Sequence, residues 1–514
     1  MVNPLKYKRR FSSIVRIGDI PLGGNEPIRI QSMTNTDTSD VELTADQIIT
    51  IYEAGADYVR ITVPTSYVAE RIPEIKSKLK EKEVDVPLIA DIHFSPKAAE
   101  VSAQYIEKVR INPGNYIDKK QFKHIEYTDE EYQEELNRIK DNILPLIQIC
   151  KKNSTSVRIG TNHGSLSDRI MSRYGDTPLG MVESTMEFLR VFKEENFNDI
   201  VISMKASNPI VMIHAVRLLV KTMTAEDMHY PLHLGVTEAG NEIEGRIKSA
   251  VGIGALLADG IGDTIRVSLT ESPEKEIPVA KMIVNTFAGT ALNDSNAPSL
   301  NIPDQYDPFS YKKHMTNPVD ITGGENVPVV ISTIPGEIDA HSLIKCGFIY
   351  ESKSKTYKNT DSSSDFIYYD GNDKPDFLPD SIRLLRSDNI ISINDLITKN
   401  DTSENYFIEC VAGVDHNLEL LAEHKNSLIV LDLTYSKAPV HEARAFFFNL
   451  MNMNLKNPVI LKVKSKEITE KEIVEISAIT GSLMIDGLAD GIWIDTNVDY
   501  IRNARELSFG ILQA

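Results

Sequence analysis

Basic residues recur near the ends of short apolar segments in the first half of this chain. YVRITVP (58–64) and DIVISMKAS (199–207) are two such segments, rich in Ile and Val and ending in polar residues. Residues two apart on a strand share a face, and one alternation collects Arg60, Arg110, Arg158, Lys205 and Arg266. Guanidinium forks bind phosphate oxygens in pairs and an ammonium adds a point charge. The pattern therefore predicts a site for a polyanion, most simply a diphosphate.

Other polar residues follow the same alternation. They are Asp91, His93, Asn112, Asn162, Ser203, Ser207, Thr237 and Ser268. Asp91 is the one acid among these strand residues, and desolvating several cations without carboxylate partners is costly. We therefore expect a ligand to supply the missing negative charge. Glycines at the segment ends, Gly114, Gly160 and Gly240, would let the backbone approach that ligand closely.

The apolar segments alternate with stretches of helical periodicity. Eight segments precede residue 271: 28–35, 58–64, 88–94, 108–115, 156–164, 199–207, 232–240 and 264–270. Strand–helix alternation indicates parallel strands, and eight units close a (β/α)8 TIM barrel, whose reactive groups lie at the carboxyl ends of the strands. We assign residues 1–288 to this α/β barrel as the substrate-binding domain. The long fourth connection, 116–140, is predicted to be a loop with an extra helix.

A second strand–helix series follows a region of different composition. Residues 289–326 are rich in Pro, Asn, Asp and Gly without periodicity, which is typical of a linker. Residues 327–514 contain further apolar segments and predict a second barrel-like α/β domain. Because this domain lacks the inward series of Arg and Lys, we expect its role to be structural.

The bulk composition excludes several classes of partner. A net charge of −19 over 514 residues argues against nucleic acid and anionic membranes as the main partners. The basic N-terminus is followed by no apolar run, and no stretch has the length of a membrane span. Cys150, Cys346 and Cys410 are widely separated and form no CxxC pair, which fits a reducing cytoplasm.

Glu238, in the segment LHLGVTEAG, leaves other functions open. A carboxylate there is either a solvated loop residue or is directed at a ligand. Asp91 and His93, with His233 and Glu238, could instead hold a metal ion, as in metal-dependent barrel hydrolases or a pterin-binding-type transferase. A non-catalytic diphosphate-binding module is the remaining alternative.

The segment ends also carry a family resemblance. QSMTNT, VRITVP, ADIHF, RINPGN, RIGTNHGSL, SMKAS, HLGVTEAG and GIGDTIRVSLT, in this order, resemble the 4-hydroxy-3-methylbut-2-en-1-yl diphosphate synthases over about residues 10–290. RINPGN and HLGVTEAG together are highly specific. The resemblance implies reductive opening and dehydration of 2-C-methyl-D-erythritol 2,4-cyclodiphosphate in isoprenoid biosynthesis. It further implies a [4Fe-4S] cluster and an electron donor such as ferredoxin or flavodoxin.

The resemblance has one large departure. The region after residue 300 resembles the three-domain form of the family, in which a C-terminal domain holds the cluster through three cysteines and a glutamate, with a CPxCGR-like motif. This sequence has no such motif, and its cysteines match none of those positions. We therefore expect the cluster ligands to lie outside this chain, which would bind substrate without reducing it. The resemblance implies that Glu238 faces the substrate, as a proton donor or an orienting group. A homodimer is among the expected assemblies.

Overall fold

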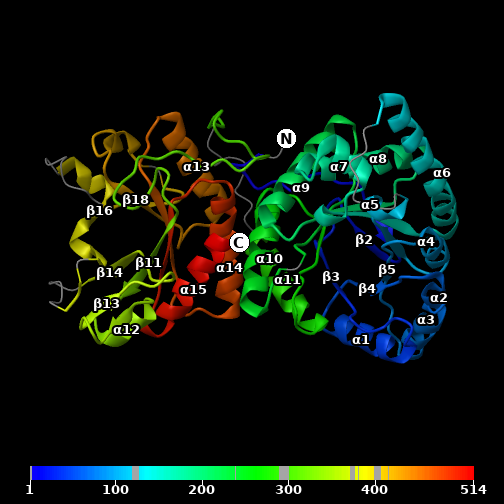
Figure 1. Ribbon diagram of the computed structural model, residues 1–514, viewed down its shortest axis with the longest axis horizontal. Helices are drawn as coiled ribbons and strands as arrows, with labels where there is room; N and C mark the ends of the chain where they lie inside the picture. Colours follow the sequence, from blue (N-terminus) through cyan, green and yellow to red (C-terminus); the bar gives the residue numbers. More distant parts are fainter. Residues whose placement is uncertain are drawn as a thin grey trace. The chain divides into compact units, whose positions relative to one another are not determined.

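The chain forms two compact units. The computed structural model describes residues 3–117, 127–237, 239–288, 300–370, 377–379, 381–398, 407–414 and 416–514. The first unit is Arg9–Asn285, and the second is Thr286–Ala514 together with Asn3–Lys8. Figure 1 shows that each unit has strands enclosed by helices.

Eight parallel strands form the sheet of the first unit. Their order is β8-β7-β6-β5-β4-β3-β10-β9, with bounds β3 (Arg29–Met33), β4 (Tyr58–Thr62), β5 (Leu88–Asp91), β6 (Lys108–Ile111), β7 (Ser156–Asn162), β8 (Ile200–Lys205), β9 (His233–Leu234) and β10 (Thr264–Ile265). A parallel bridge between Ile202 and Leu232 brings the two ends of the sheet together. The predicted α/β barrel is confirmed, with strands shorter than the apolar segments because the segment ends turn toward the following helices.

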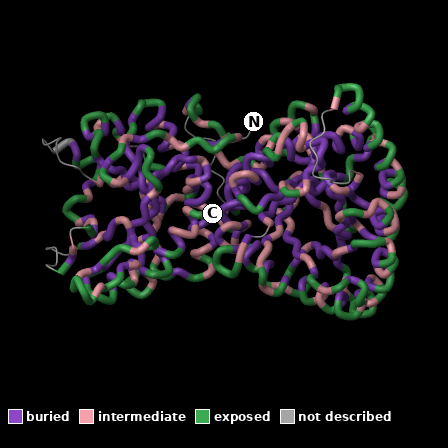
Figure 2. The backbone as a smooth tube through the Cα atoms, in the orientation of Figure 1, coloured by how far each residue is buried: buried purple, intermediate pink, exposed green. Residues whose placement is uncertain are grey.

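Helices follow the strands and bury an apolar face on them. They are α1 (Val41–Glu53), α2 (Ser66–Ala69), α3 (Ile72–Glu81), α4 (Pro96–Ser102), α5 (Pro113–Tyr116), α6 (Asp129–Asn153), α7 (Asp168–Tyr174), α8 (Pro178–Glu194), α9 (Pro209–Ala225), α10 (Glu242–Ala258) and α11 (Glu276–Phe287). In α1, Asp40 caps the first turn, and Ala45, Ile48 and Ile51 form the buried stripe. Figure 2 shows the resulting pattern, in which strands and inner helix faces are buried and outer turns are exposed.

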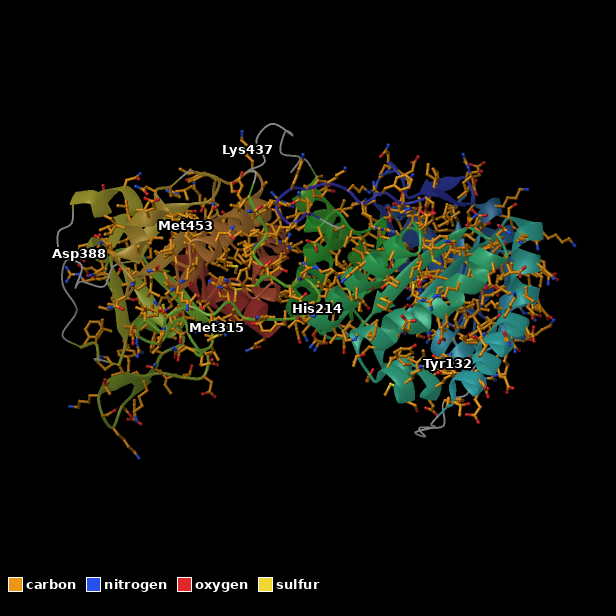
Figure 3. All side chains as sticks on the ribbon, turned by 90° about the horizontal axis from the view of Figure 1, so that it is seen from above. Tyr132, His214, Met315, Asp388, Lys437 and Met453 are labelled. Carbon is orange, nitrogen blue, oxygen red and sulfur yellow. The ribbon has the colours of Figure 1, made fainter. Side chains whose placement is uncertain are left out.

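In the described residues of the long fourth connection, the short α5 is followed by α6, which is itself the crossover to β7. It begins with a capping box between Thr128 and Glu131 and runs for 25 residues. Tyr132, labelled in Figure 3, donates a hydrogen bond to Glu187 of α8. The residues predicted to form an extra helix are thus the first turns of α6, while residues 118–126 lie outside the described part of the chain.

A short antiparallel hairpin, which the sequence analysis did not predict, packs against inward residues of the first barrel. It consists of β1 (Val15–Ile17) and β2 (Ile20–Leu22). Val15, Ile17 and Leu22 form one apolar cluster with the barrel residues Tyr58, Ile89 and Val201. The hairpin supplies an apolar floor beneath the polar upper part of the barrel.

The second unit contains another eight-stranded parallel sheet. Its order is β15-β14-β11-β20-β19-β18-β17-β16, with bounds β11 (Val329–Ile334), β14 (Phe366–Tyr369), β15 (Arg383–Arg386), β16 (Ile390–Ser392), β17 (Phe407–Val411), β18 (Leu428–Asp432), β19 (Val459–Lys464) and β20 (Gly491–Asp495). The strands at the two ends, β15 and β16, are consecutive in the chain and joined by the short helix η4 (Ser387–Asn389). The sheet is therefore a nearly closed barrel, as predicted.

Helices and a hairpin complete the second unit. The helices are α12 (Ala340–Lys345), α13 (Pro439–Asn452), α14 (Glu470–Ile485) and α15 (Ile501–Gln513), and the hairpin pairs β12 (Ile349–Glu351) with β13 (Thr356–Lys358). Within the predicted linker, residues 300–326 are described. His314 N donates to Gly487 O at 2.8 Å, and Thr316 Oγ1 donates to Asp490 Oδ1 at 3.1 Å, so this segment packs on the second unit. No helix of the described ranges has both the length and the apolar character needed to span a membrane.

The floor of the first barrel makes a testable contribution to stability. Ile17 is fully buried, whereas Arg16, beside it on β1, is exposed. Ile17→Ala should lower the free energy of unfolding of the first unit by about 2–5 kcal/mol, because it removes buried methyl groups and leaves a cavity. Arg16→Ala, the matched control, should change it by less than about 0.5 kcal/mol. Guanidinium denaturation followed by circular dichroism measures both, and equal effects would contradict the packing role of the hairpin.

Candidate active site

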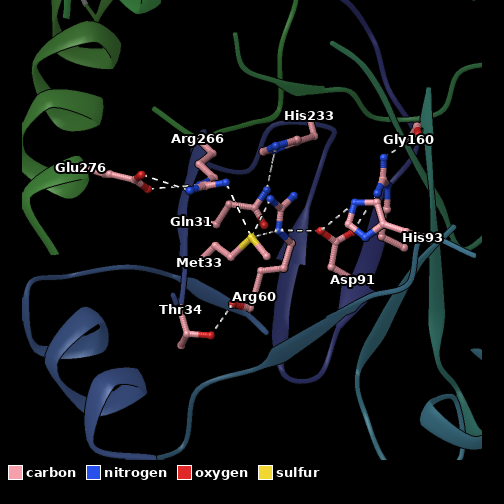
Figure 4. Close-up of polar contacts among 11 residues, drawn as sticks. Gln31, Met33, Thr34, Arg60, Asp91, His93, Gly160, His233, Arg266 and Glu276 are labelled. Carbon is pink, nitrogen blue, oxygen red and sulfur yellow. Dashed lines mark hydrogen bonds and ion pairs between the residues drawn. The ribbon is translucent and has the colours of Figure 1, made fainter. Parts of the chain in front are cut away.

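The inward positions near the carboxyl ends of the first barrel lie side by side through the strand register. Asp91 pairs with Arg110, and Arg110 pairs with Arg158, across β5, β6 and β7. Gly160 of β7 lies beside Ser203 of β8. Figure 4 shows how the side chains of this upper layer converge inside the barrel.

Asp91 anchors two guanidiniums from neighbouring strands. Arg110 Nη1 donates to Asp91 Oδ1 at 3.0 Å, and Arg60 Nε lies 3.6 Å from Oδ2. Burial alone would raise the pKa of the Asp91 carboxyl, but Arg60, Arg110 and Arg158 outweigh it and hold that pKa far below its ordinary range. Asp91 is therefore ionised, and it fixes the direction of both arginines.

Gly160 makes room for one of these arginines. Arg110 Nη2 donates to Gly160 O at 2.9 Å, and a methyl group at position 160 would lie 2.4 Å from Arg110 Nε. The predicted role of this glycine was close approach to a ligand. In the structure, its missing side chain admits the Arg110 guanidinium.

Arg266 has a carboxylate partner that the strand pattern missed. Glu276, the first residue of α11, accepts from Arg266 Nε and Nη2, both at 3.1 Å. The strand alternation could not identify this acid, because it lies on a helix and reaches the barrel only through the fold. Among the described residues, the carboxylates of Asp91 and Glu276 therefore both contact guanidiniums of the inward layer, while Asp91 remains the acid of the strand alternation.

The remaining cations have no carboxylate partner among the described residues. Arg158 Nε and Nη1 are buried and have no hydrogen-bond partner among the described residues. Lys108 Nζ is likewise buried without such a partner. Lys205 is 5% exposed, and its Nζ would lie 3.0 Å from a methyl group at Gly235. Burial, followed by the neighbouring guanidiniums, lowers the pKa of Arg158 and of Lys205. This excess of positive groups requires a compensating anion.

Lys108 is an inward cation that the sequence analysis did not include. It precedes Arg110 by two residues on β6 and therefore shares its face. Its Nζ lies 4.9 Å from the centroid of the Tyr58 ring, a contact that partly stabilises an ammonium. The alternation around Arg110 was a sufficient signal to find it.

His233 of β9 is buried next to Gln31 of β3. Gln31 Nε2 lies 2.5 Å from His233 Nδ1. Burial, then the charges of Lys205 and Arg158, lower the pKa of His233 well below its ordinary value. This imidazole is therefore neutral near neutral pH.

The residues considered for a metal ion have other partners. Asp91 serves two arginines, His93 Nε2 lies 3.9 Å from Asp91 Oδ2, and His233 contacts Gln31. Across the described ranges, no three His, Cys, Asp or Glu residues are arranged to hold a metal ion. Glu238 lies outside the described residues.

The other predicted site residues occupy varied positions. Asn112 is fully buried and caps α5 by accepting from Gly114 N at 3.3 Å. Ser203 is buried beside Gly160, where its Oγ would lie 3.2 Å from an added methyl group. Asn162, Thr237 and Ser268 are half-buried, and Ser207 is exposed. The upper layer thus brings together Arg60, Asp91, His93, Arg110, Arg158, Ser203, Lys205 and Arg266, while Ser207 is on the surface.

The three cysteines do not fit the ligands of an iron–sulfur cluster. Cys150 lies on α6, Cys346 follows α12 and Cys410 lies on β17. Burial raises the pKa of each thiol to about 12. A cluster needs clustered thiolates, and these are separated, protonated core thiols.

The corresponding end of the second barrel is electrostatically different. One inward Lys is present there: Lys462 Nζ lies 4.6 Å from the centroid of the Trp493 ring and donates to Glu409 at 2.8 Å. Trp493 Nε1 donates to Thr333 Oγ1, which donates to Asp495, both at 2.9 Å. The polar groups here satisfy one another, in contrast to the unpaired cations of the first barrel.

Sequence comparisons give one consistent family. Residues 12–281 match the family model described as the GcpE TIM-barrel domain. The 4-hydroxy-3-methylbut-2-en-1-yl diphosphate synthase (flavodoxin) of Parabacteroides distasonis is 44% identical over 526 residues, covering 99% of this chain and 82% of that protein. The enzyme of the same name from Bacteroides fragilis (strain YCH46) is 45% identical over 522 residues, covering 99% and 80%. A dihydropteroate synthase structure from Yersinia pestis aligns with a TM-score of 0.36 at 12% identity, over 54% of this chain and 99% of that chain.

Arg158 and Lys205 should be unfavourable for stability without a bound anion. Arg158→Met and Lys205→Met should leave the Tm unchanged or raise it, because each removes a buried cation that no carboxylate balances. Arg217, which pairs with Asp259 at 2.7 Å in the same unit, provides the control. Arg217→Met should destabilise by about 3–5 kcal/mol, since it leaves Asp259 buried without its partner. Differential scanning calorimetry measures the Tm of each variant. A large drop in Tm for Arg158→Met would identify Arg158 as a structural cation.

His233 should make folding sensitive to acid. Its folded pKa lies below the ordinary value of 6.5, so its contribution to stability is present above pH 6.5 and is lost as the pH falls. Between pH 6 and 5 the native protein should lose up to about 1.4 kcal/mol more per pH unit than His233→Gln. Denaturant titrations at several pH values give this difference in slope, and parallel curves for the two proteins would contradict it.

Proposed function

We propose that this chain, which belongs to the family of the 4-hydroxy-3-methylbut-2-en-1-yl diphosphate synthases (flavodoxin), binds 2-C-methyl-D-erythritol 2,4-cyclodiphosphate at the carboxyl end of its first barrel. The reaction is reductive ring opening and dehydration to 4-hydroxy-3-methylbut-2-enyl diphosphate, a step of isoprenoid biosynthesis. An electron-transfer protein of the flavodoxin or ferredoxin class is the proposed protein partner.

The observation that carries the proposal is the imbalance of charge inside the first barrel. Its cations are the buried Lys108, Arg60, Arg110, Arg158 and Lys205 and the partly buried Arg266, whereas its described carboxylates are Asp91 and Glu276. Buried cations of this number are stable only beside negative charge, and a diphosphate has the required charge in a compact form.

The residues of the layer divide the binding task. Arg158 and Lys205 have no carboxylate partner among the described residues and are available to the phosphoryl oxygens. Arg60 and Arg110 are already directed by Asp91, so they bind with little loss of side-chain entropy. Asn112, Asn162, Ser203, Ser207, Thr237, Ser268 and His93 complete the proposed contacts with the substrate.

Proton delivery is the remaining task that we propose for this chain. Removing a hydroxyl group as water requires a proton on the departing oxygen. Glu238 follows β9 directly and is proposed as the proton donor or as the group that orients this oxygen. The cysteines supply no cluster ligand in this proposal, so these 514 residues bind and orient the substrate and move a proton.

Three further features belong to the same proposal. A cytoplasmic location agrees with three buried free cysteines. The structural role of residues 327–514 agrees with the mutually satisfied polar groups of the second barrel. A homodimer rests on the resemblance alone, and sedimentation velocity would test it.

Calorimetric titration with the cyclic diphosphate tests the function. The native chain should bind it saturably at one site, and Arg158→Met should weaken binding by about 10–100-fold, because charge-assisted hydrogen bonds contribute about 1.5–3 kcal/mol each. Arg16→Ala removes an exposed positive charge elsewhere on the unit and should leave the Kd unchanged. Glu238→Gln should also retain binding. Absence of saturable binding, or native affinity in Arg158→Met, would reject the proposal.

A further inference from the structure

We propose that Glu276 is a positioning residue of the diphosphate site, which holds Arg266 so that Arg266 and Arg60 form a two-arginine clamp around the sulfur of Met33. This inference rests on the proposed function and deepens it. Glu276 would act through Arg266 and would not itself touch the substrate.

Both oxygens of the Glu276 carboxylate are fully used. Oε2 accepts from Arg266 Nε at 3.1 Å and from Ser32 Oγ at 2.6 Å. Oε1 accepts from Arg266 Nη2 at 3.1 Å and from Leu269 N at 3.3 Å. Glu276 is 2% exposed, and these four bonds fix the plane of the Arg266 guanidinium against β3 and the loop after β10.

The fixed guanidinium presents its remaining nitrogen to the barrel interior. Arg266 Nη1 lies 3.7 Å from Met33 Sδ, and Arg60 Nε and Nη2 lie 3.0 and 2.9 Å from the same sulfur. Figure 4 shows the two arginines approaching Met33, Arg60 from β4 and Arg266 from the loop after β10. Two like charges around one weak acceptor repel each other, so each needs an outer anchor. Asp91 anchors Arg60, and Glu276 anchors Arg266.

A carboxylate in an anion site has two opposing effects. Its charge weakens the attraction for a diphosphate, whereas its hydrogen bonds hold a binding group in place. At Glu276 the positioning effect outweighs the effect of its charge, because a misplaced guanidinium fork loses its paired contacts with phosphate. If Glu276 only reduced the positive field of the site, its removal would strengthen diphosphate binding.

Two substitutions separate these effects. Glu276→Gln removes the negative charge and replaces one acceptor oxygen with a donor, which disrupts the fork to Arg266. Glu276→Asp keeps the charge but shortens the side chain by one methylene. Isothermal titration of the full chain with the cyclic diphosphate should show binding weakened roughly tenfold or more in both. Tighter binding in Glu276→Gln, or native binding in Glu276→Asp, would overturn the proposal.

The role of Arg266 is tested in a double-mutant cycle. In the Arg266→Ala background, Glu276→Gln should no longer weaken binding, because the group that it positions is gone. An undiminished loss in that background would show that Glu276 acts by another route and would also overturn the proposal. If the native chain does not bind the cyclic diphosphate, it is the proposed function that fails.

Controls separate positioning from folding. Asp259→Asn disrupts another buried ion pair in the same unit, with Arg217, and should lower the Tm while changing the Kd by no more than about twofold. If the Glu276 variants do not fold, Ser32→Ala replaces them, because it keeps the carboxylate and removes the hydroxyl that donates to Oε2 at 2.6 Å and also lies 3.0 Å from Pro273 O. It should weaken binding by roughly two- to fivefold, and an unchanged Kd would count against the proposal.

Discussion

The Asp91 carboxylate, shared between guanidiniums from two neighbouring strands, is the interaction on which the upper layer of the first barrel depends. It stabilises Arg60 and Arg110 in a water-poor interior and fixes where each points. Because it is one charge against two, it orders these cations without neutralising them. The barrel therefore keeps a directed positive field, which a freely solvated cluster of arginines would not provide.

The two barrels use polar residues in different ways. In the second barrel Lys462, Glu409, Thr333 and Asp495 form bonds that satisfy one another around Trp493. In the first barrel Arg158 and Lys108 retain donors without partners among the described residues. The two barrels have similar topology, but the hydrogen-bond network is complete in the second unit and incomplete in the first. The incomplete network is the one expected where an anionic ligand takes part, which supports placing substrate binding in the first unit and a structural role in the second.

Strand periodicity was enough to predict the eight-stranded barrel and the shared face of its cations, since both follow from the alternation of side chains. It was not enough for contacts made by other elements. Glu276 meets Arg266 only because α11 begins beside β3 and β10. A pattern of neighbouring residues in the sequence does not show how close two separate elements lie in the fold. Lys108 follows the same alternation, but it lies two residues before Arg110 on β6 and was not included among the site residues. The hairpin of β1 and β2 escaped because three-residue strands show no period, although Gly18 and Asp19 between them are typical of a tight turn. Glu238, proposed as the proton donor or as an orienting group, remains a prediction from sequence.

The polar upper layer is compatible with a stable unit because stability comes from elsewhere in the same barrel. Below the cations, Val15, Ile17 and Leu22 of the hairpin pack with Tyr58 and Ile89. Outside the strands, the helices bury apolar stripes such as that of α1. These two apolar layers do not use the inward residues near the carboxyl ends of the strands, so the cations there contribute little to folding and can oppose it. A barrel divided in this way can hold unbalanced positive charge at one end, and its affinity for a diphosphate then follows from the electrostatic free energy that the bound anion releases.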